Sequence, residues 1–165
     1  MQKPSILAFL GFAAVTATAG PAAAMPLGPD ARVCESGGPA MLVKVSGFRD
    51  RVGKVRVRSF GGDPATYFDK RHALAWIQVS VPASGPVEIC VPVRAPGLYA
   101  IDVRHDVNDN GKTDSADGAG ASGNPDLGFW DVVFKRRPPA AKVQVAVGRT
   151  TVVVPVQLKY FGGGR

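Results

Sequence analysis

Short segments rich in β-branched residues recur along most of this sequence, and their spacing constrains the fold more than any other feature. In residues 54–60, for example, apolar and polar residues alternate, which is typical of a strand with one buried face. Further expected strands are residues 41–45, 75–81, 87–91, 98–103, 129–134, 142–147 and 151–158. Turn-forming Gly and Pro residues separate these segments. About seven short strands at this spacing predict an all-β fold, a single antiparallel β-sandwich.

Three stretches depart from the strand pattern. Residues 64–74 have a mixed pattern that supports at most one short turn or helix. Pro155 lies inside the last expected strand and cannot donate a backbone hydrogen bond, so we expect that strand at a sheet edge or with a bulge. Residues 106–128 contain few large apolar side chains, which predicts an unusually long connection.

The first residues have the features of a secretory signal peptide. Lys3 precedes an apolar run at residues 6–15, and small residues end the segment at Ala24. The apolar run is shorter than the roughly 20 residues that cross a bilayer, so we expect no transmembrane span in the mature chain. We therefore predict a signal peptide at residues 1–24 and export to the periplasm or the extracellular space, with an uncleaved anchor as the alternative.

The remaining chain has the length of one domain, which we place at residues 25–160, followed by a flexible tail at residues 161–165. Cys34 and Cys90 are the only cysteines in the sequence. An even number of cysteines in an exported chain favours pairing, so we predict a Cys34–Cys90 disulfide. Buried free thiols are the alternative.

Residues 106–117 match the DxNxNG pattern of a calcium-binding loop. The expected oxygen ligands are Asp106, Asn108, Asn110, the Lys112 carbonyl, Asp114 and Asp117. Asp117 stands where such loops usually carry a bidentate Glu, which favours weak binding. No apolar helix flanks the loop, so we expect a calcium loop on a β scaffold. The alternative is an Asx-rich turn that needs no ion.

Basic residues alternate along one expected strand, where Lys54, Arg56 and Arg58 share a face. Removal of Lys3 with the signal peptide lowers the net charge from +7 to +6. This face could attract anionic glycans or phosphates, and a solvated outer face is the alternative. We expect no nucleic-acid partner, because the chain lacks basic motifs interleaved with aromatic residues. Trp76 is expected to pack in the core or at an edge.

The sequence contains no recognisable catalytic motif. We find no nucleophile elbow, no HExxH pattern and no Gly-rich phosphate loop. His105 stands beside the acidic loop, where a role as a base is conceivable and a role in supporting the loop is expected. We therefore predict no enzymatic activity and no catalytic residues.

Several motifs together resemble those of a known family. They are PGLYAI at residues 96–101, His105–Asp106, Asn108, Asn110–Gly111–Lys112 and Gly128–Phe129. The chain resembles the exported bacterial proteins catalogued as domain of unknown function 2141. This resemblance implies a transthyretin-like (prealbumin-like) or carboxypeptidase-regulatory-like β-sandwich with no established activity. Residues 118–123 depart from the family, whose members should be more apolar there.

These observations lead to one functional hypothesis and two alternatives. We expect an exported non-enzymatic module that binds calcium structurally and contacts an envelope glycan or protein. The alternatives are a purely structural domain without an ion, and a hydrolase that uses His105.

Overall fold

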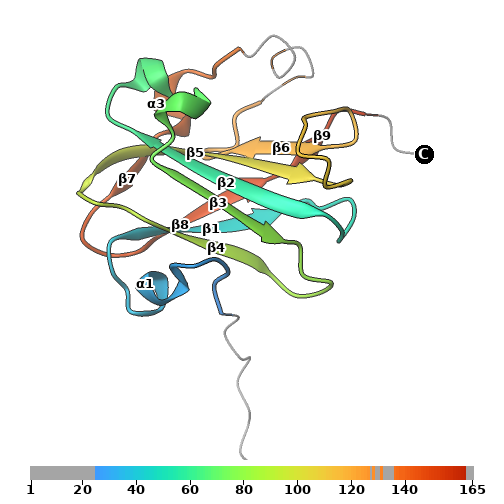
Figure 1. The fold of residues 1–165 in the computed structure, drawn as a ribbon. Coiled ribbons are helices and arrows are strands. Elements are labelled where there is room, and N and C mark those ends of the chain that lie inside the picture. The colour runs from blue at the N-terminus through green and yellow to red at the C-terminus, as the bar shows by residue number, and fades with distance from the viewer. Residues whose placement is uncertain (1–24, 127, 129–130, 132–135, 163–165) are drawn as a thin grey trace, which may run out of the picture.

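The computed structural model describes residues 25–126, 128, 131 and 136–162. Within these ranges the chain forms two β-sheets that lie one over the other (Figure 1). The predicted signal peptide at residues 1–24 lies outside the described residues, as do most of the expected strand at 129–134 and the end of the predicted tail. An all-β architecture with two sheets is confirmed.

The smaller sheet has three strands in the order β4 (Val87–Pro92), β1 (Ala40–Ser46) and β8 (Val152–Gln157). Strand β1 pairs antiparallel with β4 but parallel with β8. The expectation of a purely antiparallel sandwich is therefore wrong. The strand before β8 in the sequence belongs to the larger sheet, so β8 is not joined to β1 by a hairpin. It can therefore run in the same direction as β1.

The larger sheet contains β3 (Ala75–Ser80), β2 (Lys54–Gly61), β5 (Gly97–Asp106), β6 (Gly118–Ala121) and β9 (Lys159–Tyr160), in that order. A further strand, β7 (Val145–Val147), pairs with the first residues of β5. All pairs in this sheet are antiparallel. The described residues thus form nine strands, not about seven, because β6 and β9 arise where no strand was expected.

Helical structure in the described residues is limited to short segments. They are α1 (Ala31–Glu35), the 3₁₀ turns η1 (Pro64–Thr66) and η2 (Lys70–His72), and α3 (Ala140–Val143). Residues 64–74 are helical only in short turns, as expected, but they form two 3₁₀ turns where at most one short turn or helix was expected. Helix α3 corrects the strand expected at 142–147, which begins only at Val145. No helix among the described residues is long and apolar enough to span a membrane.

The core lies between the two sheets, where alternate side chains of facing strands meet. Val55 and Val57 of β2 are fully buried, whereas the residues between them point to the outer face. Among the described strands, β8 pairs only with β1 and is an edge strand, which confirms the position expected from Pro155. The predicted disulfide between Cys34 of α1 and Cys90 of β4 is present. It fastens α1 against the smaller sheet (Figure 1).

Candidate functional site

The acidic loop begins where β5 ends, at Asp106, and leads into β6 at Gly118. Strand β2 holds the start of the loop, since Lys54 pairs in register with Asp106. Gly53 lies so close that a Cβ atom there would stand 2.1 Å from the Asp106 carbonyl oxygen. The turn before β2 thus packs directly against the first residue of the loop, and only glycine fits there.

Three of the predicted ligands converge inside the loop. The side-chain amide nitrogens of Asn108 and Asn110 lie 2.9 and 2.8 Å from the same carboxylate oxygen of Asp114, and both donate to it. The hydrogen bond from Asn108 is the largest cause of a lowered pKa at Asp114. The third, fifth and ninth positions of the predicted calcium loop therefore share one centre.

The two ends of the loop are tied to the same network. Asp106 accepts hydrogen bonds from the backbone N–H groups of Asn110 and Gly111, at 3.2 and 2.9 Å. Asp117 accepts from the N–H groups of Val107 and Asp114, both at 3.3 Å. Asp106 and Asp117 are only 2% and 4% exposed, unlike the middle of the loop. Burial raises the pKa of Asp117, because a desolvated carboxylate loses the stabilisation that water gives its charge.

Arg104 supplies a cation to this loop, and sequence reasoning missed it. Its Nη2 atom lies 2.9 Å from Asp106 Oδ2, and its Nη1 atom donates to Thr113 Oγ1 at 3.0 Å. Arg104 and Asp106 stand two residues apart on β5 and so share one face of the strand. The two-residue spacing of Arg104 and Asp106 could have indicated their ion pair from the sequence. The contact with Thr113 could not be predicted, because it arises only when the loop folds back over the strand.

Lys112 contributes to the loop through its backbone, where its N–H group donates to the Asn110 side-chain oxygen at 2.7 Å. Across the described part of the chain, no three His, Cys, Asp or Glu side chains are grouped so that they could hold a metal ion. The acids of the loop therefore make no metal centre by themselves. A calcium site at this place would also need amide and carbonyl oxygens, which Ca²⁺ accepts readily.

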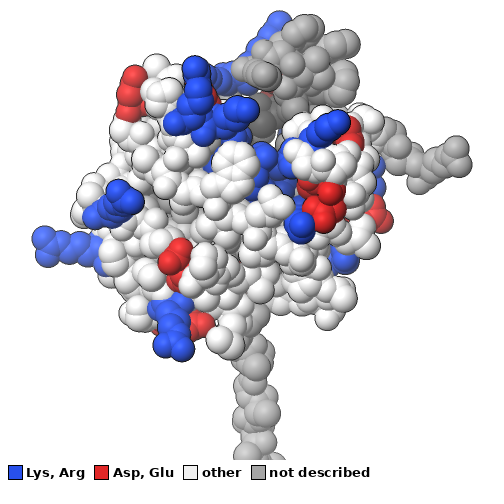
Figure 2. Space-filling view, viewed as in Figure 1, with Lys and Arg blue, Asp and Glu red and all other residues white. Residues whose placement is uncertain are grey.

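The outer face of the larger sheet carries the expected row of cations, Lys54, Arg56 and Arg58, which confirms their alternation on β2. In Figure 2, Lys and Arg side chains gather on the upper part of this face and beside the acidic cluster of the β5–β6 loop. Trp76 was expected in the core or at an edge, and it lies on β3, which among the described strands is an edge strand of the larger sheet, and not in the core. Its side chain lies on this outer face and is 52% exposed.

His105 points to the inner side of the larger sheet and is fully buried. Its Nε2 atom lies 2.7 Å from the Val52 carbonyl oxygen and its Nδ1 atom 2.6 Å from the Tyr160 hydroxyl. A carbonyl oxygen only accepts, so in the neutral ring Nε2 carries the proton and the Tyr160 hydroxyl donates to Nδ1. Both ring nitrogens are thus engaged in supporting neighbouring segments, and the ring faces away from the loop carboxylates.

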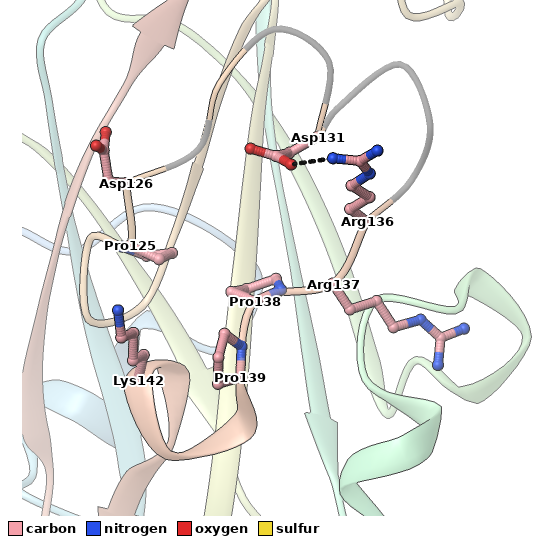
Figure 3. Close-up of a pocket in the computed structure, with 8 residues that line it drawn as sticks. All are labelled: Pro125, Asp126, Asp131, Arg136, Arg137, Pro138, Pro139 and Lys142. Carbon is pink, nitrogen blue, oxygen red and sulfur yellow. Dashed lines mark ion pairs between the residues drawn. The ribbon is translucent and has the colours of Figure 1, made fainter.

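A shallow hollow of about 260 Å³ lies beside the segment that leads to α3 (Figure 3). Asp131 faces Arg136 across it at 3.9 Å. Asp126 also borders the hollow, but its carboxylate pairs with Lys159 at 2.8 Å. The described residues that line the hollow include no Ser, Cys or His; its charged side chains are those of Asp126, Asp131, Arg136, Arg137 and Lys142.

Comparison with known proteins gives a family. No curated protein and no solved structure matches the chain. One family model matches residues 43–154, a range that runs from β1 to β8 and contains the whole acidic loop. The match covers well over half of the sequence. The chain therefore belongs to the family described as "Uncharacterized protein conserved in bacteria (DUF2141)".

Proposed function

We propose that this chain is an exported, non-enzymatic β-sandwich module of transthyretin-like type, which acts in the periplasm or outside the cell. Its acidic loop binds calcium structurally, and its surface engages an envelope glycan or protein. The observation that carries the calcium proposal is the convergence of Asn108 and Asn110 on one oxygen of Asp114. Asp106 and Asp117 close the loop from its two ends.

A modest change in the loop would create the coordination shell. The two amide nitrogens now point at Asp114, and rotation of each amide by about 180° would present its oxygen in the same place. The rotation would break the hydrogen bonds that these oxygens accept from the N–H groups of Asn110 and Lys112, and calcium coordination would have to offset that loss. A calcium ion between those oxygens would then replace the N–H groups as the partner of Asp114. The Lys112 carbonyl and the carboxylates of Asp106 and Asp117 complete the predicted set. Because Asp replaces Glu at the last position, we expect a dissociation constant of about 0.1–1 mM.

The second candidate is a structural domain without an ion, and Arg104 is the observation that favours it. Its guanidinium already neutralises Asp106 and contacts Thr113. The loop carboxylates are also satisfied by backbone N–H groups. In this case the loop keeps its shape through hydrogen bonds and one internal ion pair.

Thermal unfolding distinguishes the two candidates. Calcium at about ten times its dissociation constant should stabilise the folded chain by about 1.4 kcal/mol over the chelated protein, with a smaller effect of magnesium. Asp114→Asn should abolish this stabilisation because it removes the charge at the centre of the loop. Asp109→Asn is the matched control, because Asp109 pairs with Lys54 outside the predicted ligand set. If calcium does not change the melting temperature of the wild-type protein, the calcium proposal is wrong and the structural domain without an ion remains.

A further inference from the structure

On the outer face of the larger sheet, as far as the structure describes it, Arg56 is a cation without an ion pair. Lys54 pairs with Asp109, and Arg104 with Asp106, each at 2.9 Å. Arg58 pairs with Asp102 on the neighbouring strand. Arg56 stands in the middle of this group, directly beside Arg104 in the register of β2 and β5. Within the described part of the chain, no carboxylate pairs with Arg56.

The environment of Arg56 leaves its charge poorly compensated. Its Nε atom is buried without a hydrogen-bond partner among the described residues. Desolvation by burial lowers the pKa of Arg56 to about 10; the carboxylate of Asp102, and less strongly that of Asp106, opposes this shift, whereas the cations Arg58 and Arg104 add to it. A partly desolvated guanidinium without a carboxylate is costly, so an anion bound from outside would be stabilised at this position.

An exposed aromatic side chain lies next to this cation. The Arg56 guanidinium carbon is 4.9 Å from the centre of the Trp76 ring, and the Arg58 carbon is 5.3 Å from it. Gln78 is exposed and stands directly opposite Arg56 in the register of β2 and β3. A cation, an exposed indole and an amide thus stand together on neighbouring strands, on the sheet face seen in Figure 2.

We propose that Arg56, Trp76 and Gln78 form a binding site for an acidic sugar residue of the uronic-acid type. The carboxylate would pair with the terminal nitrogens of Arg56, the apolar side of the sugar ring would stack on Trp76, and Gln78 would bind a hydroxyl group. The single positive charge of Arg56, which has no ion-pair partner among the described residues, matches a monoanionic carboxylate better than a phosphate dianion. The inference deepens the proposed function, because it assigns the glycan partner named there to one surface and one chemical class.

Calorimetric titration with trigalacturonate tests this site. The full chain should bind trigalacturonate in buffer with chelator, and should bind the neutral galactose trisaccharide and inorganic phosphate at least about tenfold more weakly. Arg56→Gln and Trp76→Ala should each weaken trigalacturonate binding about tenfold or more. Arg149→Gln is the matched control, because it removes the same charge from an exposed turn and should leave the affinity unchanged.

Three results would overturn the proposal: no binding of trigalacturonate at millimolar concentration, equal losses in the Arg56 and Arg149 variants, or phosphate binding as tight as that of the saccharide. If Arg56→Gln unfolds the chain, Arg56→Lys keeps the charge but loses the planar fork, and it should still weaken binding. Calcium-dependent melting of the same proteins without saccharide reports on the loop alone. A chain that responds to calcium but binds no uronate would therefore contradict this inference and not the calcium proposal.

Discussion

His105 is a buried connector between segments that are distant in the sequence. It reaches Val52 in the turn before β2 and Tyr160 in β9, and its ring packs edge-on against Phe48 at 5.1 Å between ring centres. Its neighbours Arg104 and Asp106 face the opposite side of β5, toward the acidic loop. The alternation along one strand therefore separates the residues of the proposed calcium loop from the imidazole that a hydrolase would need.

We predict that His105→Ala lowers the free energy of unfolding by about 3 kcal/mol, because it leaves a cavity at a fully buried position and unpairs two partly buried hydrogen-bonding groups. Chemical denaturation measures the loss. His72→Ala is the control, because the His72 side chain is half exposed and should change stability by less than about 0.5 kcal/mol. A His105→Ala protein as stable as the wild type would contradict the connecting role.

Strand β6 illustrates what the sequence could not reveal at the scale of elements. Its residues, Gly118–Ala121, have low strand propensity and were expected in a long irregular connection. The structure explains the small residues by close approach. A Cβ atom on Gly120 would lie 2.7 Å from a methyl carbon of Val156 and 2.8 Å from the Gln157 carbonyl oxygen. The strand forms because only a glycine-rich segment fits beside β8, which depends on tertiary packing.

We predict that Gly120→Ala destabilises the chain by about 1–3 kcal/mol, since the added methyl group must displace Val156 or the backbone at Gln157. Thermal unfolding measures the change. Gly148→Ala is the matched control, because a Cβ atom there would meet no atom within 4 Å. Equal melting temperatures for the two variants would show that β6 does not pack tightly against β8.

Elements with a strong local pattern were predictable, and those that depend on distant contacts were not. Strand β2 alternates from Lys54 to Arg58, and its expected range differs from the observed Lys54–Gly61 by one residue. Helix α3 (Ala140–Val143) replaces the first part of an expected strand. It buries only Val143, so no alternating pattern in the sequence marked it as a helix. At the acidic loop the spacing of Asn108, Asn110 and Asp114 anticipated their convergence, whereas the arrival of Arg104 required the folded sheet.

At the scale of the whole molecule, the disulfide fixes the N-terminal segment to the smaller sheet. Cys34 and Cys90 are separated by 56 residues in the sequence. We predict that Cys34→Ser combined with Cys90→Ser lowers the free energy of unfolding by about 2–5 kcal/mol, because the unfolded chain gains conformational freedom. Denaturation of the wild-type protein in reductant is the control and should give the same stability. A double variant as stable as the oxidised protein would show that the bridge constrains little.

Arg104 joins the acidic loop to the outer sheet face, so the two proposed sites should be coupled. A calcium ion that takes Asp106 as a ligand would compete with Arg104 for that carboxylate. The released guanidinium would then stand without its carboxylate beside Arg56, its register partner.

We predict that calcium tightens the binding of monomeric galacturonate about fivefold, and that galacturonate tightens calcium binding by the same factor, since coupling free energies are reciprocal. Calorimetric titration with and without calcium measures both effects, and Arg104→Gln should remove them. If the galacturonate affinity of the wild-type protein is the same in calcium and in chelator, calcium binding does not release the Arg104 guanidinium from Asp106, and the two sites are not coupled.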